Sequence, residues 1–125
     1  MTENDISYLI RGAIFEVYNS LGPGLLESTY ESALTYELEL RGLDVKTQIS
    51  IPIEYKGKLL ETSYRLDMLV NDCVIIELKS VQELEKIHFK QLYTYLRLSD
   101  KRLGILVNFN CSDIVSNIKR VVNDM

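Results

Sequence analysis

Residues 65–79 read RLDMLVNDCVIIELK, and their charged side chains occupy positions where a hydrophobic core is expected. Asp67 follows a strand-like run, while Glu77 and Lys79 close the apolar run that starts at Cys73. Transfer of an unpaired carboxylate out of water costs on the order of several kcal/mol, so buried carboxylates are paired or bind a metal. The stretch therefore predicts a site for a divalent metal ion.

Apolar residues at steps of three and four predict four helices around this stretch. The Leu21-Gly22-Pro23-Gly24 segment separates the first two helices, and Gly42 ends the second. Ser112 or Asp113 provides the N-cap of the last helix, whose apolar residues share one face. The predicted helices span residues 6–21, 26–41, 83–99 and 114–122.

Four runs with strand character lie between these helices. Alternation of apolar and polar residues begins at Val45, and Pro52 indicates an edge position. Turns join the first three strands into an antiparallel meander, and the helix before the fourth permits a parallel crossover. The predicted strands span residues 45–55, 60–70, 73–79 and 103–109. The fold class is therefore α/β, with the order ααβββαβα and a mixed four-stranded sheet.

Size and composition predict a single domain over residues 1–125, because 46% hydrophobic and 26% charged residues suffice for an ordinary core. No apolar run reaches the roughly 18 residues of a membrane span, and the N-terminus is acidic where a secretory signal is basic. We therefore expect a cytoplasmic protein with no membrane partner. Cys73 and Cys111 lie in or beside apolar segments, which predicts reduced, buried thiols.

Strand geometry predicts that the two acids meet. Side chains two residues apart share a face, so Arg65 and Asp67 point one way while Leu66 and Met68 point the other. If the second and third strands pair so that opposed residue numbers sum to about 143, Asp67 lies across from a position near Glu77. Both carboxylates then face one point.

Two carboxylates at that range repel each other unless a hard cation such as Mg²⁺ or Mn²⁺ takes their oxygens as ligands. Lys79 shares the face of Glu77 and can hold a water at the metal. The metal itself lowers the pKa of that water and stabilises the charge that develops on a phosphate. The alternative is a pair of internal salt bridges without a metal, joining Glu77 to Lys79 and Asp67 to Arg65.

Asp67, followed nine residues later by Glu77-Leu78-Lys79, resembles the signature of the PD-(D/E)xK nuclease superfamily, although Leu66 replaces the leading proline. The resemblance implies a restriction-endonuclease-like αβββαβ core. It also implies that Asp67, Glu77 and the Leu78 carbonyl bind the metal while Lys79 orients water. Residues 24–30, GLLESTY, are similar to the motif of the small bacterial GxxExxY proteins of that superfamily.

The GxxExxY resemblance adds Glu27 as a further catalytic residue and metal ligand, on the helix before the meander. The other reading of Glu27 is an acid that stabilises a helix N-terminus. Tyr30 lies one turn later, so it joins the candidate substrate contacts, and Gly24 is expected to shape the turn.

Further candidate substrate contacts are Arg65, which can clamp a phosphate, and His88, Gln91 and Tyr95 on one side of the third helix. Gln91 and Tyr95 resemble a QxxxY motif of RecB-like members of the superfamily. The structural readings are a solvated His88 and a core position for Tyr95.

The sequence thus predicts a Mg²⁺- or Mn²⁺-dependent phosphodiesterase that acts on DNA or RNA. The net charge of −4 and the pI near 5.0 disfavour electrostatic binding of nucleic-acid phosphates by the chain as a whole, although the segment from Lys86 to Arg102 is locally basic. Two alternatives stay open: a catalytically silent module that dimerises or binds a partner, and a hydrolase of small nucleotides. A homodimer would enlarge the footprint that one small subunit offers to a duplex.

Overall fold

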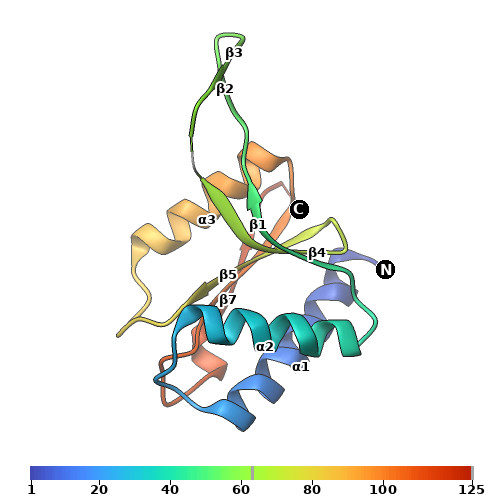
Figure 1. Ribbon diagram of the computed structural model, residues 1–125, viewed down its shortest axis with the longest axis vertical. Coiled ribbons are helices and arrows are strands. Elements are labelled where there is room, and N and C mark those ends of the chain that lie inside the picture. The colour runs from blue at the N-terminus through green and yellow to red at the C-terminus, as the bar shows by residue number, and fades with distance from the viewer. Residues whose placement is uncertain (63, 125) are drawn as a thin grey trace.

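A five-stranded mixed sheet separates two layers of helices in the computed structural model (Figure 1), which describes residues 1–62 and 64–124. Helices α1 (Glu3–Leu21) and α2 (Glu27–Leu40) pack on one face, and α3 (Lys86–Ser99) packs on the other. The sheet consists of β1 (Val45–Ser50), β4 (Arg65–Val70), β5 (Val74–Lys79), β6 (Leu103–Asn108) and β7 (Ile118–Val122). This α/β architecture agrees with the fold class predicted from the sequence.

The strands lie in the order β1-β4-β5-β6-β7. The pairs β1/β4 and β4/β5 are antiparallel, as predicted for a meander. Helix α3 then carries the chain across so that β6 pairs in parallel with β5. The crossover buries β5 and β6 in the middle of the sheet, which explains their continuous apolar sequences.

Local chemistry explains where the helices begin and end. Thr2 and Asp5 form a capping box at the start of α1, and Gly22 with φ +70° ends that helix. Helix α2 runs to Leu40, close to the predicted end, before Gly42 adopts φ +84°. Helix α3 starts at Lys86, three residues later than predicted, because Glu85 and His88 form its capping box.

Two hydrophobic cores form, one on each face of the sheet. The larger core joins α1 and α2 to the sheet, and the smaller core joins α3 to it. A Cβ added to Gly104 on β6 would lie 2.8 Å from Leu92 Cδ1, so this glycine lets α3 approach the strand closely.

The predicted last helix is wrong. The chain forms only a short 3₁₀ helix, η1 (Val115–Asn117), and then strand β7, which pairs antiparallel with β6. The side chain of Asp113 accepts a hydrogen bond from the Ser116 hydroxyl, but Ile114 is the N-cap of this single turn and makes no side-chain cap. The β-branched residues of 118–122 favour a strand, and pairing with β6 supplies their backbone partners.

The predicted four-stranded sheet is wrong, because the main sheet has five strands. In addition, the first two predicted strands are each interrupted, and the pieces between the breaks form a hairpin of their own. A separate two-stranded hairpin, β2 (Ile53–Tyr55) and β3 (Lys58–Leu60), projects from the body of the protein (Figure 1). Its turn lies where the sequence predicted it, with positive φ at Lys56 and Gly57. The fifth strand of the main sheet is β7.

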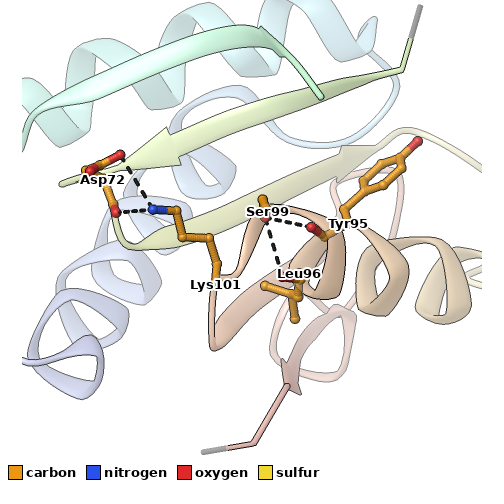
Figure 2. Close-up of polar contacts among 5 residues, drawn as sticks. All are labelled: Asp72, Tyr95, Leu96, Ser99 and Lys101. Atoms are coloured by element: carbon orange, nitrogen blue, oxygen red, sulfur yellow. Dashed lines mark hydrogen bonds and ion pairs between the residues drawn. The ribbon is translucent and has the colours of Figure 1, made fainter. Parts of the chain in front are cut away.

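The turn between β4 and β5 sets the register of the acids. Val70 pairs with Val74, one residue beyond the predicted pairing, because Asn71 and Asp72 both adopt positive φ and Cys73 belongs to the turn. Lys101 donates to the backbone carbonyl of Asp72 at 2.9 Å and also approaches its carboxylate (Figure 2). This contact ties the turn to the segment before β6.

Both cysteines, Cys73 and Cys111, are free thiols, and both are half-buried where the sequence predicted buried ones. Within residues 1–62 and 64–124, none of the helices has the length and apolar character needed to cross a membrane.

Candidate active site

Asp67 and Glu77 lie where β4 and β5 cease to pair as a regular ladder. The paired positions run from Val70 and Val74 to Met68 and Ile76. At the next position, side-chain carboxylates replace backbone carbonyls as the hydrogen-bond acceptors. The Asp67 amide donates to Glu77 Oε1 at 3.2 Å, and the Leu78 amide donates to Asp67 Oδ2 at 2.9 Å. The predicted meeting of the two acids therefore occurs.

The regular alternation of β4 does not continue through Asp67, which corrects one prediction. Leu66 and Met68 were expected on the same face, yet Leu66 packs in the α3 core and Met68 in the opposite core. Opposite Asp67, the paired positions of β1 and β4 skip Gln48, whose φ of +52° is unusual for a residue with a side chain. Such backbone costs of order 1–3 kcal/mol and is concentrated at functional sites.

Burial and charge together perturb Glu77. Its side chain is only 5% exposed. Burial raises the pKa of Glu77 to about 9, and the negative charge of Asp67 and a hydrogen bond between the two carboxyl groups act in the same direction. The hydrogen bond from the Asp67 amide and the charge of the Lys79 ammonium lower this pKa, but by less than burial and Asp67 raise it. The pair therefore retains a proton at neutral pH or requires a cation.

Lys79 is the last residue of β5 and lies beside Asn108, the last residue of β6. It is half-buried, and its charge acts on Glu77. Arg65, the first residue of β4, is exposed. Over the described part of the chain, the ion pairs join Arg41 to Glu37, Lys101 to Asp72 and Arg102 to Glu3. The salt bridges that formed the alternative reading of the acids are thus not made in the described residues.

A cavity of about 130 Å³ opens beside Asp67 on the side of α2. Glu27, the first residue of α2, lines this cavity together with Asp67 and Leu78. Glu31 and Gln48 also line it, and the Gln48 amide donates to the Glu31 carboxylate at 2.8 Å. Neither residue was among the site residues predicted from the sequence. Glu31 lies one helical turn after Glu27, so helix spacing was a usable signal, whereas nothing in the sequence indicated Gln48.

The structure explains the GLLESTY segment. Gly24 adopts φ +95°, which shapes the turn before α2 as expected. The ring of Tyr30 is fully buried and stacks on Phe109 with centroids 4.4 Å apart. Its hydroxyl donates to the Gly22 carbonyl at 2.5 Å and accepts from the Leu25 amide at 3.2 Å. These contacts fix the loop that delivers Glu27, and this buried position gives Tyr30 a structural role in place of the predicted substrate contact.

Two more contacts fix the segment that follows Lys79. The Ser80 hydroxyl donates to the Leu25 carbonyl at 2.7 Å, which joins the end of β5 to the loop before α2. Asn108, 1% exposed, accepts from the Val81 amide at 3.0 Å and donates to the Val81 carbonyl at 2.9 Å. The segment that follows β5 is therefore fixed both by the loop before α2 and by the end of β6.

The candidate residues on α3 divide into two groups. Tyr95 is 8% exposed, and burial followed by the charges of Glu77 and Asp67 raises its pKa, while a hydrogen bond from Gln91 lowers it. Tyr95 therefore lies within electrostatic range of the acid pair, and Gln91 is its hydrogen-bond partner. His88 instead caps α3, because its Nδ1 accepts from the Glu85 amide at 3.0 Å. This contact gives His88 a structural role.

The donor set is composed of oxygen atoms, which suits Mg²⁺ or Mn²⁺. Within residues 1–62 and 64–124, no group of three or more His, Cys, Asp or Glu side chains is arranged to hold a metal. Magnesium, however, is commonly held by one or two carboxylates together with waters and substrate phosphates. Asp67 and Glu77, whose repulsion a cation would relieve, fit such a site.

The family comparison agrees with this geometry. The model of the PD-(D/E)XK nuclease superfamily matches residues 4–121, which include the three helices and the five strands of the sheet except for Glu3 of α1 and Val122 of β7. Searches of curated proteins and of solved structures return no match. The match spans nearly the whole chain, and the protein belongs to the PD-(D/E)XK nuclease superfamily.

Proposed function

We propose that this protein is a metal-dependent nuclease that hydrolyses phosphodiester bonds of DNA or RNA. The observation that carries the proposal is the insertion of the Asp67 and Glu77 carboxylates between β4 and β5, beside Lys79. A buried acid pair must keep a proton or bind a cation, and a bound cation would relieve the repulsion between the two carboxylates when both are ionised. We also assign the protein to the GxxExxY group of its superfamily on the basis of Gly24, Glu27 and Tyr30.

Asp67, Glu77 and the Leu78 carbonyl would hold Mg²⁺ or Mn²⁺, and Glu27 faces the same cavity as Asp67. When bound, the cation would lower the pKa of a water and stabilise charge on the phosphate. Lys79 holds the attacking water in position with its ammonium group. The amides of Asp67 and Leu78 keep the carboxylates fixed through the hydrogen bonds described above. Gln91 and Arg65 are the proposed contacts to the phosphate backbone of the substrate.

A panel of single- and double-stranded DNA and RNA, incubated with Mg²⁺ or Mn²⁺, tests this proposal. We expect Lys79→Ala to slow cleavage by about 100-fold or more, as is usual when a group that assists proton transfer is removed. Lys46→Ala, which changes an exposed lysine on β1, is the matched control. Cleavage that persists unchanged in Lys79→Ala would contradict the assigned site.

The net charge of −4 favours a second candidate, a module that kept the fold and binds a partner without catalysis. The same panel separates the two functions. If the wild type cleaves no member of the panel with either ion, the nuclease proposal fails and the second candidate takes its place for nucleic-acid substrates.

A further inference from the structure

A second cavity, of about 330 Å³, lies on the opposite side of the sheet from the cavity that Glu27 lines. It is bordered by α3 and by the base of the projecting β2–β3 hairpin (Figure 1). Its walls include Ile53, Tyr64, Ile87, Lys90, Gln91 and Tyr95. We call it the tyrosine groove.

Tyr95 is the residue of the tyrosine groove that interacts electrostatically with the acid pair. The hydroxyl of Ser99 donates to the Tyr95 carbonyl at 2.6 Å, and Figure 2 shows the ring directed away from this bond, toward the side of the sheet where β5 ends. The ring of Tyr95 packs in the same core cluster as Leu66, the residue before Asp67, and the charges of Glu77 and Asp67 raise the pKa of Tyr95. A ligand in the groove would therefore lie next to the proposed cleavage site.

The lining of the tyrosine groove suits a flat ligand with polar edges and an anionic neighbour. The rings of Tyr64 and Tyr95 are 6.5 Å apart and tilted by 59°, and Tyr64 is 51% exposed, so its ring is available to a ligand. Ile53 and Ile87 add apolar wall, whereas Lys90 and Gln91 supply a cation and an amide. Tyrosine faces stack on nucleobases, and lysine contacts the phosphates that link them.

We propose that the tyrosine groove binds an unpaired nucleobase of the substrate strand, adjacent to the phosphate that is cleaved. This inference rests on the proposed nuclease function and names its substrate class, a nucleic acid with a single-stranded segment. A base inside a duplex is already stacked on both faces and cannot enter the groove without being flipped out.

A second copy of this chain is the competing occupant, because Ile87 and Tyr64 expose apolar surface. Two features favour the nucleobase: Tyr95 of the groove packs in the same core cluster as Leu66, the neighbour of Asp67, and Lys90 supplies a cation. The molecular mass in solution distinguishes the two occupants.

The test uses a single-stranded DNA oligonucleotide that carries the fluorescent base 2-aminopurine, titrated with the full 125-residue chain in Mn²⁺. The chain carries Lys79→Ala to prevent cleavage, and wild-type cleavage is measured in parallel. Tyr64→Ala is the test variant, and Tyr8→Ala is the matched control, because Tyr8 is 78% exposed on α1, on the other side of the sheet. A blunt duplex of the same sequence is titrated beside the single strand.

We expect quenching of 2-aminopurine and binding that Tyr64→Ala weakens by about 5- to 150-fold, the range for one lost base-stacking contact. Tyr8→Ala and the blunt duplex should show changes below about twofold. If Tyr64→Ala has no larger effect than Tyr8→Ala while the wild type still cleaves, the groove assignment is overturned and the nuclease function stands. If the single strand binds as expected but nothing is cleaved, the nuclease function fails instead.

Light scattering on the same samples completes the test. A wild-type dimer that Tyr64→Ala converts to a monomer would show that the groove is a contact between two copies, which overturns the assignment. An unchanged mass in both variants supports it.

Discussion

The substitution Glu77→Gln is predicted to stabilise the metal-free protein at neutral and alkaline pH. Glu77 is buried, and its pKa in the folded state is raised from 4.5 to about 9. The folded state therefore binds one more proton than the unfolded state throughout that interval. Stability decreases as pH rises through it, because folding must take up a proton, which becomes less favourable as the proton concentration falls.

The magnitude follows from the size of the interval. One proton of difference corresponds to about 1.4 kcal/mol per pH unit, so the wild type loses about 4 kcal/mol of Glu77-dependent stability between about pH 5 and about pH 8. A glutamine at this position carries no charge. Its carbonyl can still accept from the Asp67 amide, and its amide can donate to the Asp67 carboxylate, so both hydrogen bonds of the pair keep a partner.

Urea unfolding in the presence of a chelator, repeated across this pH range, measures the effect. The difference in unfolding free energy between Glu77→Gln and the wild type should grow with pH by about 4 kcal/mol. Glu54→Gln on β2 removes an exposed carboxylate and serves as the control for the change in net charge. Parallel pH profiles for the wild type and Glu77→Gln would refute the view that Glu77 is held against its preferred ionisation.

Three further substitutions test the framework around the site by chemical unfolding. Gly104→Ala should destabilise by about 1–3 kcal/mol, because the new Cβ would lie 2.8 Å from the Leu92 side chain; an unchanged midpoint would show that α3 moves freely. Asn108→Ala should cost about 1–3 kcal/mol and speed amide exchange at Val81, whose backbone loses two partners. Tyr30→Phe should cost about 1 kcal/mol, with Tyr36→Phe, at an exposed tyrosine, as the control that leaves stability unchanged.

Most of the helices and strands could be predicted from the sequence, because the spacing of apolar residues indicates which side of an element is buried. The apolar faces of α1 and α3 and the continuous apolar runs of β5 and β6 have the lengths and spacings that distinguish helices from buried strands. The pairing of Asp67 with Glu77 followed from a short turn between adjacent strands. The one-residue shift did not, because it depends on positive φ at Asn71 and Asp72.

The C-terminal segment could not be assigned from local pattern. Ile114, Val115, Ile118 and Val121 have helical spacing, but 118–122 also has the β-branched composition of a strand. The free edge of β6 decided between them, and that edge exists only in the folded sheet. Tertiary context of this kind overrides local preference.

The site was predictable where residues are close along the chain and not where the fold brings distant segments together. The spacing of Asp67, Glu77 and Lys79 identified the centre. Gln48 reaches the same cavity only because β1 departs from regular geometry there. Tyr30 has the sequence position of a substrate contact, yet Phe109 and the loop before α2 bury it.

Calorimetric titration of Mn²⁺ into the wild type and Asp67→Asn tests the central claim most directly. Asparagine preserves the acceptor for the Leu78 amide and removes the charge that a cation needs, so the fold should persist while binding weakens at least about tenfold. Glu54→Gln should bind Mn²⁺ as the wild type does. Equal affinity of the wild type and Asp67→Asn, or no binding by either, would contradict the assignment of a metal site between β4 and β5.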